Sequence, residues 1–111
     1  MEKLIVRGGR PLCGSIRVSG SKNAAWPLIF ASVLTEETCV IENVPAIRDV
    51  EMSFELLSSM GARIRRPHPA CVEINTKDMR PVLPPPSLVA ELRASTYLMG
   101  AMLGRFGIAY V

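Results

Sequence analysis

The first part of the chain alternates between polar and apolar residues, which predicts two short strands. The alternation runs over residues 2–7 and again over residues 15–18, and glycines and a proline at residues 8–11 separate the two runs. A period of two is typical of a strand with one buried face, whereas glycine and proline interrupt strands. We therefore expect one strand in each run.

The pattern changes to a helical spacing beyond residue 23. Within residues 24–34 the apolar residues at helical intervals are Ala25, Leu28, Ile29 and Val33. Pro27 has no backbone N–H and is best tolerated in the first turn of a helix. We therefore predict a helix that begins close to Asn23 and ends before residues 35–37.

The next segments predict a strand and a second helix. A β-branched run at residues 38–42 favours a strand, and Asn43-Val44-Pro45 ends it. Asp49 is a suitable N-cap for a helix that stops at Gly61. The apolar positions expected on one face of this helix are Val50, Phe54, Leu57 and Met60.

Two further strands complete the predicted unit. Residues 63–65 and 71–74 alternate again, and a turn at residues 67–69 would join them. The order of elements from about residue 18 to residue 75 is then β-α-β-α-β-β. This order predicts a fold of the α/β (α+β) class.

The last third of the chain predicts a connector followed by one long helix. Four prolines within residues 80–86 exclude a helix or a central strand there. Ser87 can cap a helix, straight or kinked, over residues 88–106, and the small residues within it would allow close backbone approach. Residues 108–111 are typical of the opening of another strand.

Composition and charge limit the classes of function. The 111 residues are 49% hydrophobic and 21% charged, which is typical of a globular domain. No apolar run approaches the roughly 18 residues of a membrane span, and the amino terminus has no secretory signal pattern, so we expect no membrane association and a cytoplasmic location. The net charge of +3 is scattered, which argues against a nucleic-acid surface.

Metal and disulfide chemistry are disfavoured by the same residues. The three cysteines, Cys13, Cys39 and Cys71, form no C-x-x-C pair, and the single histidine, His68, lies between two prolines. We therefore expect free thiols and no metal site.

Lys22 and Asn23 are the first candidates for chemistry. They lie at the predicted start of a helix, where unpaired N–H groups and the positive end of the helix dipole favour an anion. The preceding glycine and serine would leave room for a ligand. A solvated lysine beside a capping asparagine remains an open alternative at this point.

Arg93 is the second candidate. It stands beside small residues in an otherwise apolar predicted helix, and its planar guanidinium suits a carboxylate or a phosphate. From the residues alone, an arginine that extends to water along an apolar surface is the simpler interpretation.

Several strings resemble one enzyme family. VSGSKNAA at residues 18–25, IENVP at residues 41–45, MGA at residues 60–62 and RAS at residues 93–95 are similar, in order and spacing, to the UDP-N-acetylglucosamine enolpyruvyl transferases, a branch of the EPSP synthase-like family. The related transferases that act on shikimate 3-phosphate typically have serine at the position of Asn23. The resemblance therefore favours the UDP-sugar branch.

This resemblance implies a fold, a reaction and roles for three residues. The family fold consists of repeated β-α-β-α-β-β units, of which this chain would hold one and the start of a second. The reaction transfers the enolpyruvyl group of phosphoenolpyruvate to the 3-hydroxyl of UDP-N-acetylglucosamine, the first committed step of peptidoglycan synthesis, with no metal or other cofactor. The family's pattern gives Lys22 and Asn23 to phosphoenolpyruvate and Arg93 to UDP-N-acetylglucosamine.

The resemblance also implies what this chain would lack. The family's general acid is a loop cysteine expected a few residues beyond position 111, so we expect no catalytic residue here and no activity from these 111 residues alone. Residues 1–21 would belong to the other domain of a full enzyme, and residues 22–111 to part of the substrate-binding domain. The alternative is a non-catalytic module that binds an anion or a UDP-sugar.

Overall fold

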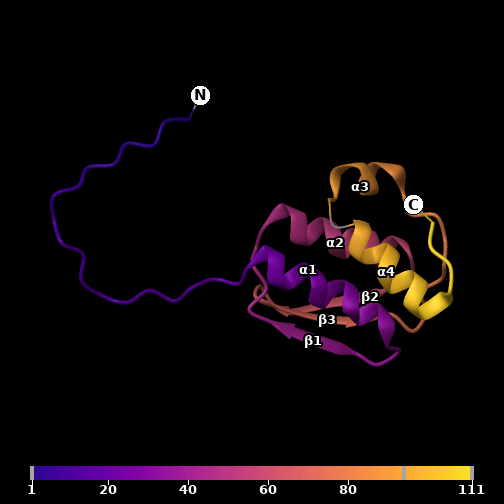
Figure 1. Cartoon of the computed structure of the whole chain (residues 1–111). Coiled ribbons are helices and arrows are strands. Elements are labelled where there is room, and N and C mark those ends of the chain that lie inside the picture. The colour runs from indigo at the N-terminus through magenta and orange to yellow at the C-terminus, as the bar shows by residue number, and fades with distance from the viewer. Residues whose placement is uncertain (1, 94, 111) are drawn as a thin grey trace.

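The computed structural model describes residues 2–93 and 95–110 and contains a small sheet covered by helices (Figure 1). Its elements are α1 (Lys22–Ala31), the 3-10 turn η1 (Ser32–Leu34), β1 (Cys39–Glu42), α2 (Arg48–Ser59), β2 (Arg63–His68), β3 (Cys71–Asn75), α3 (Pro86–Glu91) and α4 (Ser95–Phe106). From α1 to β3 these elements follow the predicted order, so the fold class is confirmed.

The sheet has three antiparallel strands in the order β1-β3-β2. Ile41 on β1 pairs with Val72, and Ile64 on β2 pairs with Ile74. Because side chains alternate between the faces of a strand, these residues share one face and enter the core. The opposite face carries Glu73, whose carboxylate lies 2.8 Å from Nε of Arg65.

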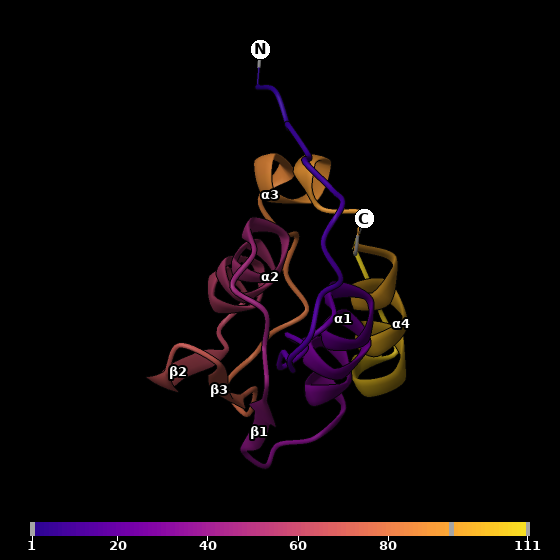
Figure 2. The same ribbon diagram turned by 90° about the vertical axis from the view of Figure 1, so that its left-hand side faces the viewer.

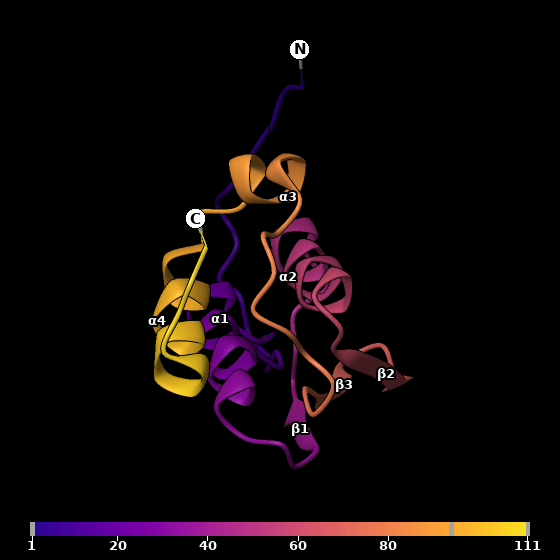
Figure 3. The ribbon, with the colours of Figure 1, turned by 90° about the vertical axis from the view of Figure 1, so that its right-hand side faces the viewer.

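The helices form two layers over the sheet. Figures 2 and 3 show α1 and α2 above one face of the sheet and α4 beside α1, on the side away from the strands. The largest side chains buried between these layers are Phe30, Ile29, Leu56, Leu57, Ile74, Met79 and Leu92. Burial of such side chains contributes roughly 1.5–3 kcal/mol each.

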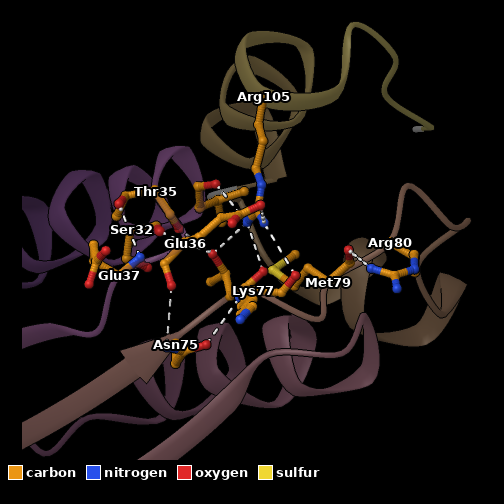
Figure 4. Close-up of polar contacts among 11 residues, drawn as sticks. Ser32, Thr35, Glu36, Glu37, Asn75, Lys77, Met79, Arg80 and Arg105 are labelled. Atoms are coloured by element: carbon orange, nitrogen blue, oxygen red, sulfur yellow. Dashed lines mark hydrogen bonds and ion pairs between the residues drawn. The ribbon is translucent and has the colours of Figure 1, made fainter.

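Arg105 joins α4 to the rest of the core. Its side chain is only 10% exposed, and its Nη1 donates hydrogen bonds to the carbonyl oxygens of Val33 and Thr76 and to the Thr76 hydroxyl, at 3.1, 2.7 and 2.6 Å (Figure 4). Three chain segments that are far apart in sequence meet at this guanidinium. The arrangement fixes α4 against η1 and the end of β3.

The two strands predicted at residues 2–7 and 15–18 do not form. Residues 2–19 are extended and exposed, and Figure 1 shows them leading away from the domain. A strand requires a neighbour that accepts and donates its backbone hydrogen bonds, and the described residues offer none to this segment. The division at residue 21 stays a prediction.

Pro27 lies deeper in α1 than predicted. The helix begins at Lys22, one residue before Asn23, so its start is confirmed, but Pro27 falls in the second turn. Its missing N–H would have bonded to the carbonyl of Asn23, four residues earlier. This carbonyl is therefore without its helical hydrogen bond.

The predicted cap roles of Asp49 and Ser87 are wrong. Ile47 is the N-cap of α2 and Asp49 lies inside its first turn, while Pro85 is the N-cap of α3, with Pro86 as the first helical residue. Neither N-cap makes a side-chain hydrogen bond. Asp49 is instead used for an ion pair, described below.

The single long helix predicted over residues 88–106 is two helices. The chain leaves the helical conformation at Leu92, which is extended and only 2% exposed, and returns to it at Ser95. Burial of Leu92 in the core offsets the loss of the helical hydrogen bonds at the break. Residues 108–110 form no strand, and the end of that predicted strand lies outside the described residues.

Within residues 2–93 and 95–110, no helix is long and apolar enough to cross a membrane. The same residues contain no cluster of three or more potential metal ligands. Cys13, Cys39 and Cys71 are free thiols, exposed, half-buried and buried in that order.

Candidate functional site

The start of α1 presents an ammonium group and open backbone donors together. Ser21 is the N-cap, and its carbonyl accepts the first helical hydrogen bond, from Ala25, at 2.9 Å. Its hydroxyl does not cap the helix. The N–H groups that precede Ala25 in the first turn therefore have no helical partner and can bind an anion.

Lys22 is held from two sides. Its Nζ lies 2.9 Å from Oδ2 of Asp49, in the first turn of α2, and 4.9 Å from the centre of the Trp26 ring, one turn further along α1. The lysine and aspartate side chains are 40% and 45% exposed. The ammonium group is thus fixed in position but still open to solvent on its remaining side.

Trp26 connects the two helices. It is 8% exposed, and its indole N–H donates to the backbone carbonyl of Asp49 at 3.4 Å. The Ser53 hydroxyl donates to the same carbonyl at 3.0 Å. The backbone of Asp49, the residue that pairs with Lys22, is therefore held in place by two hydrogen bonds.

A close backbone contact brings α1 to the loop between β1 and α2. A Cβ atom added to Gly20 would lie 1.8 Å from the carbonyl oxygen of Asn43. Asn43 has a φ of 56°, a left-handed conformation that asparagine tolerates better than most residues. Gly20 is thus required for close backbone approach, whereas the sequence predicted that it leaves room for a ligand.

Arg93 lies in the link between α3 and α4, and not inside a helix as predicted. Its side chain is exposed. Two residues earlier, Oε2 of Glu91 lies 3.5 Å from Nη2 of Arg48, the residue directly before Asp49 in the sequence. This contact places the end of α3 beside the start of α2, and so near the pair of Lys22 and Asp49.

The candidate residues therefore share one end of the domain. In Figure 1, α1, α2 and α4 all begin at the left and run to the right, and Figure 2 views their starting ends. Lys22 and Asn23 begin α1, Asp49 lies in the first turn of α2, and Arg93 precedes α4. Three helix dipoles with their positive ends on one side add to the attraction for an anionic ligand.

Tyr97 adds an aromatic surface in the first turn of α4. It is 45% exposed and stacks on Phe30, with ring centres 6.3 Å apart and planes at 12°. An exposed ring on a rigid support is suited to packing against a sugar or a base.

Sequence reasoning identified the cations of this end but missed two residues that hold Lys22. Asp49 was interpreted as a cap, and Trp26 was not considered. The spacing of Lys22 and Trp26, four residues apart on a predicted helix, was a usable signal for their contact. The pairing with Asp49 crosses 27 positions and had no local signal.

The fold is that of an enolpyruvyl transferase. The crystal structure of the enolpyruvyl transferase NikO from Streptomyces tendae superposes with a TM-score of 0.77, at 26% sequence identity, over 92% of this chain and 24% of that one. The family model of EPSP synthase (3-phosphoshikimate 1-carboxyvinyltransferase) matches residues 6–111, and the chain belongs to this family.

Curated relatives are enzymes named for the UDP-sugar. The chain is 46% identical to UDP-N-acetylglucosamine 1-carboxyvinyltransferase 3 of Symbiobacterium thermophilum and 39% identical to the UDP-N-acetylglucosamine 1-carboxyvinyltransferase of Pseudoalteromonas atlantica. Each alignment covers 100% of this chain and 26% of the relative. The chain thus spans about a quarter of the length of these relatives.

Proposed function

We propose that the chain supplies substrate contacts of an enzyme that transfers the enolpyruvyl group of phosphoenolpyruvate to the 3-hydroxyl of UDP-N-acetylglucosamine. The observation that carries this proposal is the 39–46% identity to enzymes of that name across the whole chain. The enzyme would act in the cytosol, at the first committed step of peptidoglycan synthesis.

Lys22 and Asn23 would bind phosphoenolpyruvate. This substrate carries a carboxylate and a phosphate, and the start of α1 offers an ammonium group, an amide side chain and unpaired N–H groups within one turn. A positive charge fixed beside the departing phosphate would also stabilise the charge that develops on it. The solvent-open side of Lys22 is where such an anion would lie.

Arg93 would contact UDP-N-acetylglucosamine. Its exposed guanidinium lies in a link directly before α4, where it is free to form a bidentate contact with a phosphate. The exposed ring of Tyr97, in the first turn of α4, would pack against the sugar nucleotide. The two anionic substrates would then occupy neighbouring places at the common end of α1, α2 and α4.

We assign no catalytic residue to this chain. The proton for the methylene carbon would come from a cysteine beyond position 111, because none of Cys13, Cys39 and Cys71 stands in the sequence context of the family's loop cysteine. Residues 1–21 would pair within the other domain of the enzyme, since the described part of this segment, residues 2–21, has no partner strand here.

A chimera tests the proposed activity. Residues 1–111 would replace the matching segment of the Symbiobacterium thermophilum relative, which is 46% identical over this range. We expect enolpyruvyl transfer to UDP-N-acetylglucosamine in the chimera. Lys22→Ala should lower kcat/KM at least about 30-fold, which corresponds to a loss of about 2 kcal/mol in transition-state stabilisation. A folded chimera that turns over shikimate 3-phosphate instead would overturn the choice of substrate.

Binding by the 111-residue chain separates this function from a non-catalytic module. Calorimetric titration with phosphoenolpyruvate and UDP-N-acetylglucosamine gives an affinity for each ligand. Lys22→Ala should weaken the binding of phosphoenolpyruvate, and Arg93→Ala should weaken the binding of UDP-N-acetylglucosamine. Tight binding of UDP-N-acetylglucosamine by the chain, together with no turnover in the chimera, would favour the binding module.

A further inference from the structure

Asp49 places a carboxylate in the middle of a site that is proposed to bind anions. Its Oδ2 lies 2.9 Å from Nζ of Lys22, at the end of the domain where the helix starts gather. A negative charge there repels phosphoenolpyruvate, so its presence calls for a physical reason. Exposed ion pairs contribute only about 0–1 kcal/mol to stability, which makes a purely structural reason weak.

The geometry around Lys22 supplies another reason. A lysine side chain has four rotatable bonds and loses up to about 2 kcal/mol of conformational entropy when a ligand fixes it. In this structure the ammonium group is already fixed, by the carboxylate on one side and the Trp26 ring at 4.9 Å on the other. The Lys22 side chain thus loses its conformational entropy when the chain folds, and little further entropy is lost when the ligand binds.

The support of Asp49 is itself rigid. Its carbonyl oxygen accepts hydrogen bonds from the Trp26 indole at 3.4 Å and from the Ser53 hydroxyl at 3.0 Å, and Ser53 is fully buried. The carboxylate therefore extends from an anchored turn of α2. The same tryptophan that contacts Lys22 also holds the residue that pairs with it.

We propose that Asp49 is a positioning residue that holds the Lys22 ammonium group, against Trp26, in the place where phosphoenolpyruvate binds. The inference rests on the proposed function, because it concerns the same site. It distinguishes two properties of the aspartate: its ability to accept a hydrogen bond from Lys22, which aids binding, and its charge, which opposes binding.

Two substitutions separate these properties. Asp49→Asn keeps the shape and an oxygen that accepts from the ammonium group but removes the charge, whereas Asp49→Ala removes both. Trp26 is the only tryptophan of the chain and lies against Lys22, so its fluorescence reports directly on phosphoenolpyruvate binding. Asp78→Asn is the matched control, because it makes the same charge change beyond the far end of α2, beside Gly61.

The 111-residue chain would be titrated with phosphoenolpyruvate for the wild type, the two Asp49 variants, Asp78→Asn and Lys22→Met. We expect Asp49→Asn to bind within twofold of the wild type or more tightly, Asp49→Ala to bind at least threefold more weakly, and Asp78→Asn to match the wild type. Relaxation of the Lys22 Cε nuclei without ligand should show a more mobile side chain in Asp49→Ala. Circular dichroism and urea midpoints measure any change in folding separately.

Equal affinities of Asp49→Ala and the wild type would overturn the proposal, and so would tighter binding by both Asp49 variants, which would show that the carboxylate only repels. Failure of the proposed function has a different signature. In that case the wild type shows no saturable response, or Lys22→Met binds as tightly as the wild type.

Discussion

The backbones of Gly20 and Asn43 lie so close together that a Cβ on Gly20 would be 1.8 Å from the Asn43 carbonyl oxygen. Both partners are backbone, so neither can rotate away from the other. This contact places the N-cap and first turn of α1 beside the loop that leads into α2. It is therefore a precondition for the pairing of Lys22 with Asp49.

Gly20→Ala should weaken both the fold and the site. Because the added methyl group meets a backbone atom, we expect a loss of about 1–3 kcal/mol in the free energy of unfolding. Urea unfolding followed by Trp26 fluorescence measures it. Gly8→Ala is the control, since a Cβ at Gly8 meets nothing within 4 Å. An unchanged midpoint in Gly20→Ala would show that the two segments separate readily.

Arg105→Ala should lower the free energy of unfolding more than the substitution of an exposed charged residue does. The substitution removes hydrogen bonds from a charged donor to Thr76 and Val33, in a place where the arginine is only 10% exposed. We expect a loss of about 2–4 kcal/mol. Arg63→Ala removes an arginine that is 79% exposed, and its ion pair with Asp78 should contribute less than about 1 kcal/mol. Similar urea midpoints for the two variants would contradict this prediction.

Pro27→Ala should stabilise the chain. The alanine restores an N–H that can donate to the carbonyl of Asn23 and removes the clash of the proline ring with that turn. Part of the gain is lost because the unfolded chain becomes more flexible, and we expect a net gain of about 1 kcal/mol. Thermal unfolding measures it. Pro86→Ala, at the first position of α3, where proline is well tolerated, should give no gain.

Tyr97 should contribute to sugar-nucleotide binding without a large effect on folding. Tyr97→Ala removes a ring that is 45% exposed and stacked on Phe30. We expect UDP-N-acetylglucosamine binding to weaken by about 1 kcal/mol, as for other aromatic contacts, with phosphoenolpyruvate binding unchanged. Calorimetric titration with both ligands checks this, and Tyr97→Phe should keep most of the affinity. A loss of phosphoenolpyruvate affinity of the same size would indicate a general change of structure.

The sequence predicted the elements whose signals are local. Periodicity located α1, α2 and the three strands of the sheet to within a few residues, because burial of one face imposes a period of two on strands and near 3.6 on helices. The prolines of residues 80–86 located the connector for an equally local reason. The strings around Lys22 and Arg93 also indicated the family, which the comparisons confirmed.

Only the tertiary structure decided which contacts form between those elements. Asp49 is a good N-cap by residue type, but an N-cap is defined by the neighbouring backbone, and here Ile47 takes that place while Asp49 pairs with Lys22 across 27 positions. The break near Leu92 follows from burial of that residue in the core, which no local pattern encodes. Sequence thus determined the family and the cations, because both depend on residue type and spacing, while the support of Lys22 depends on contacts between segments that meet only when the chain is folded.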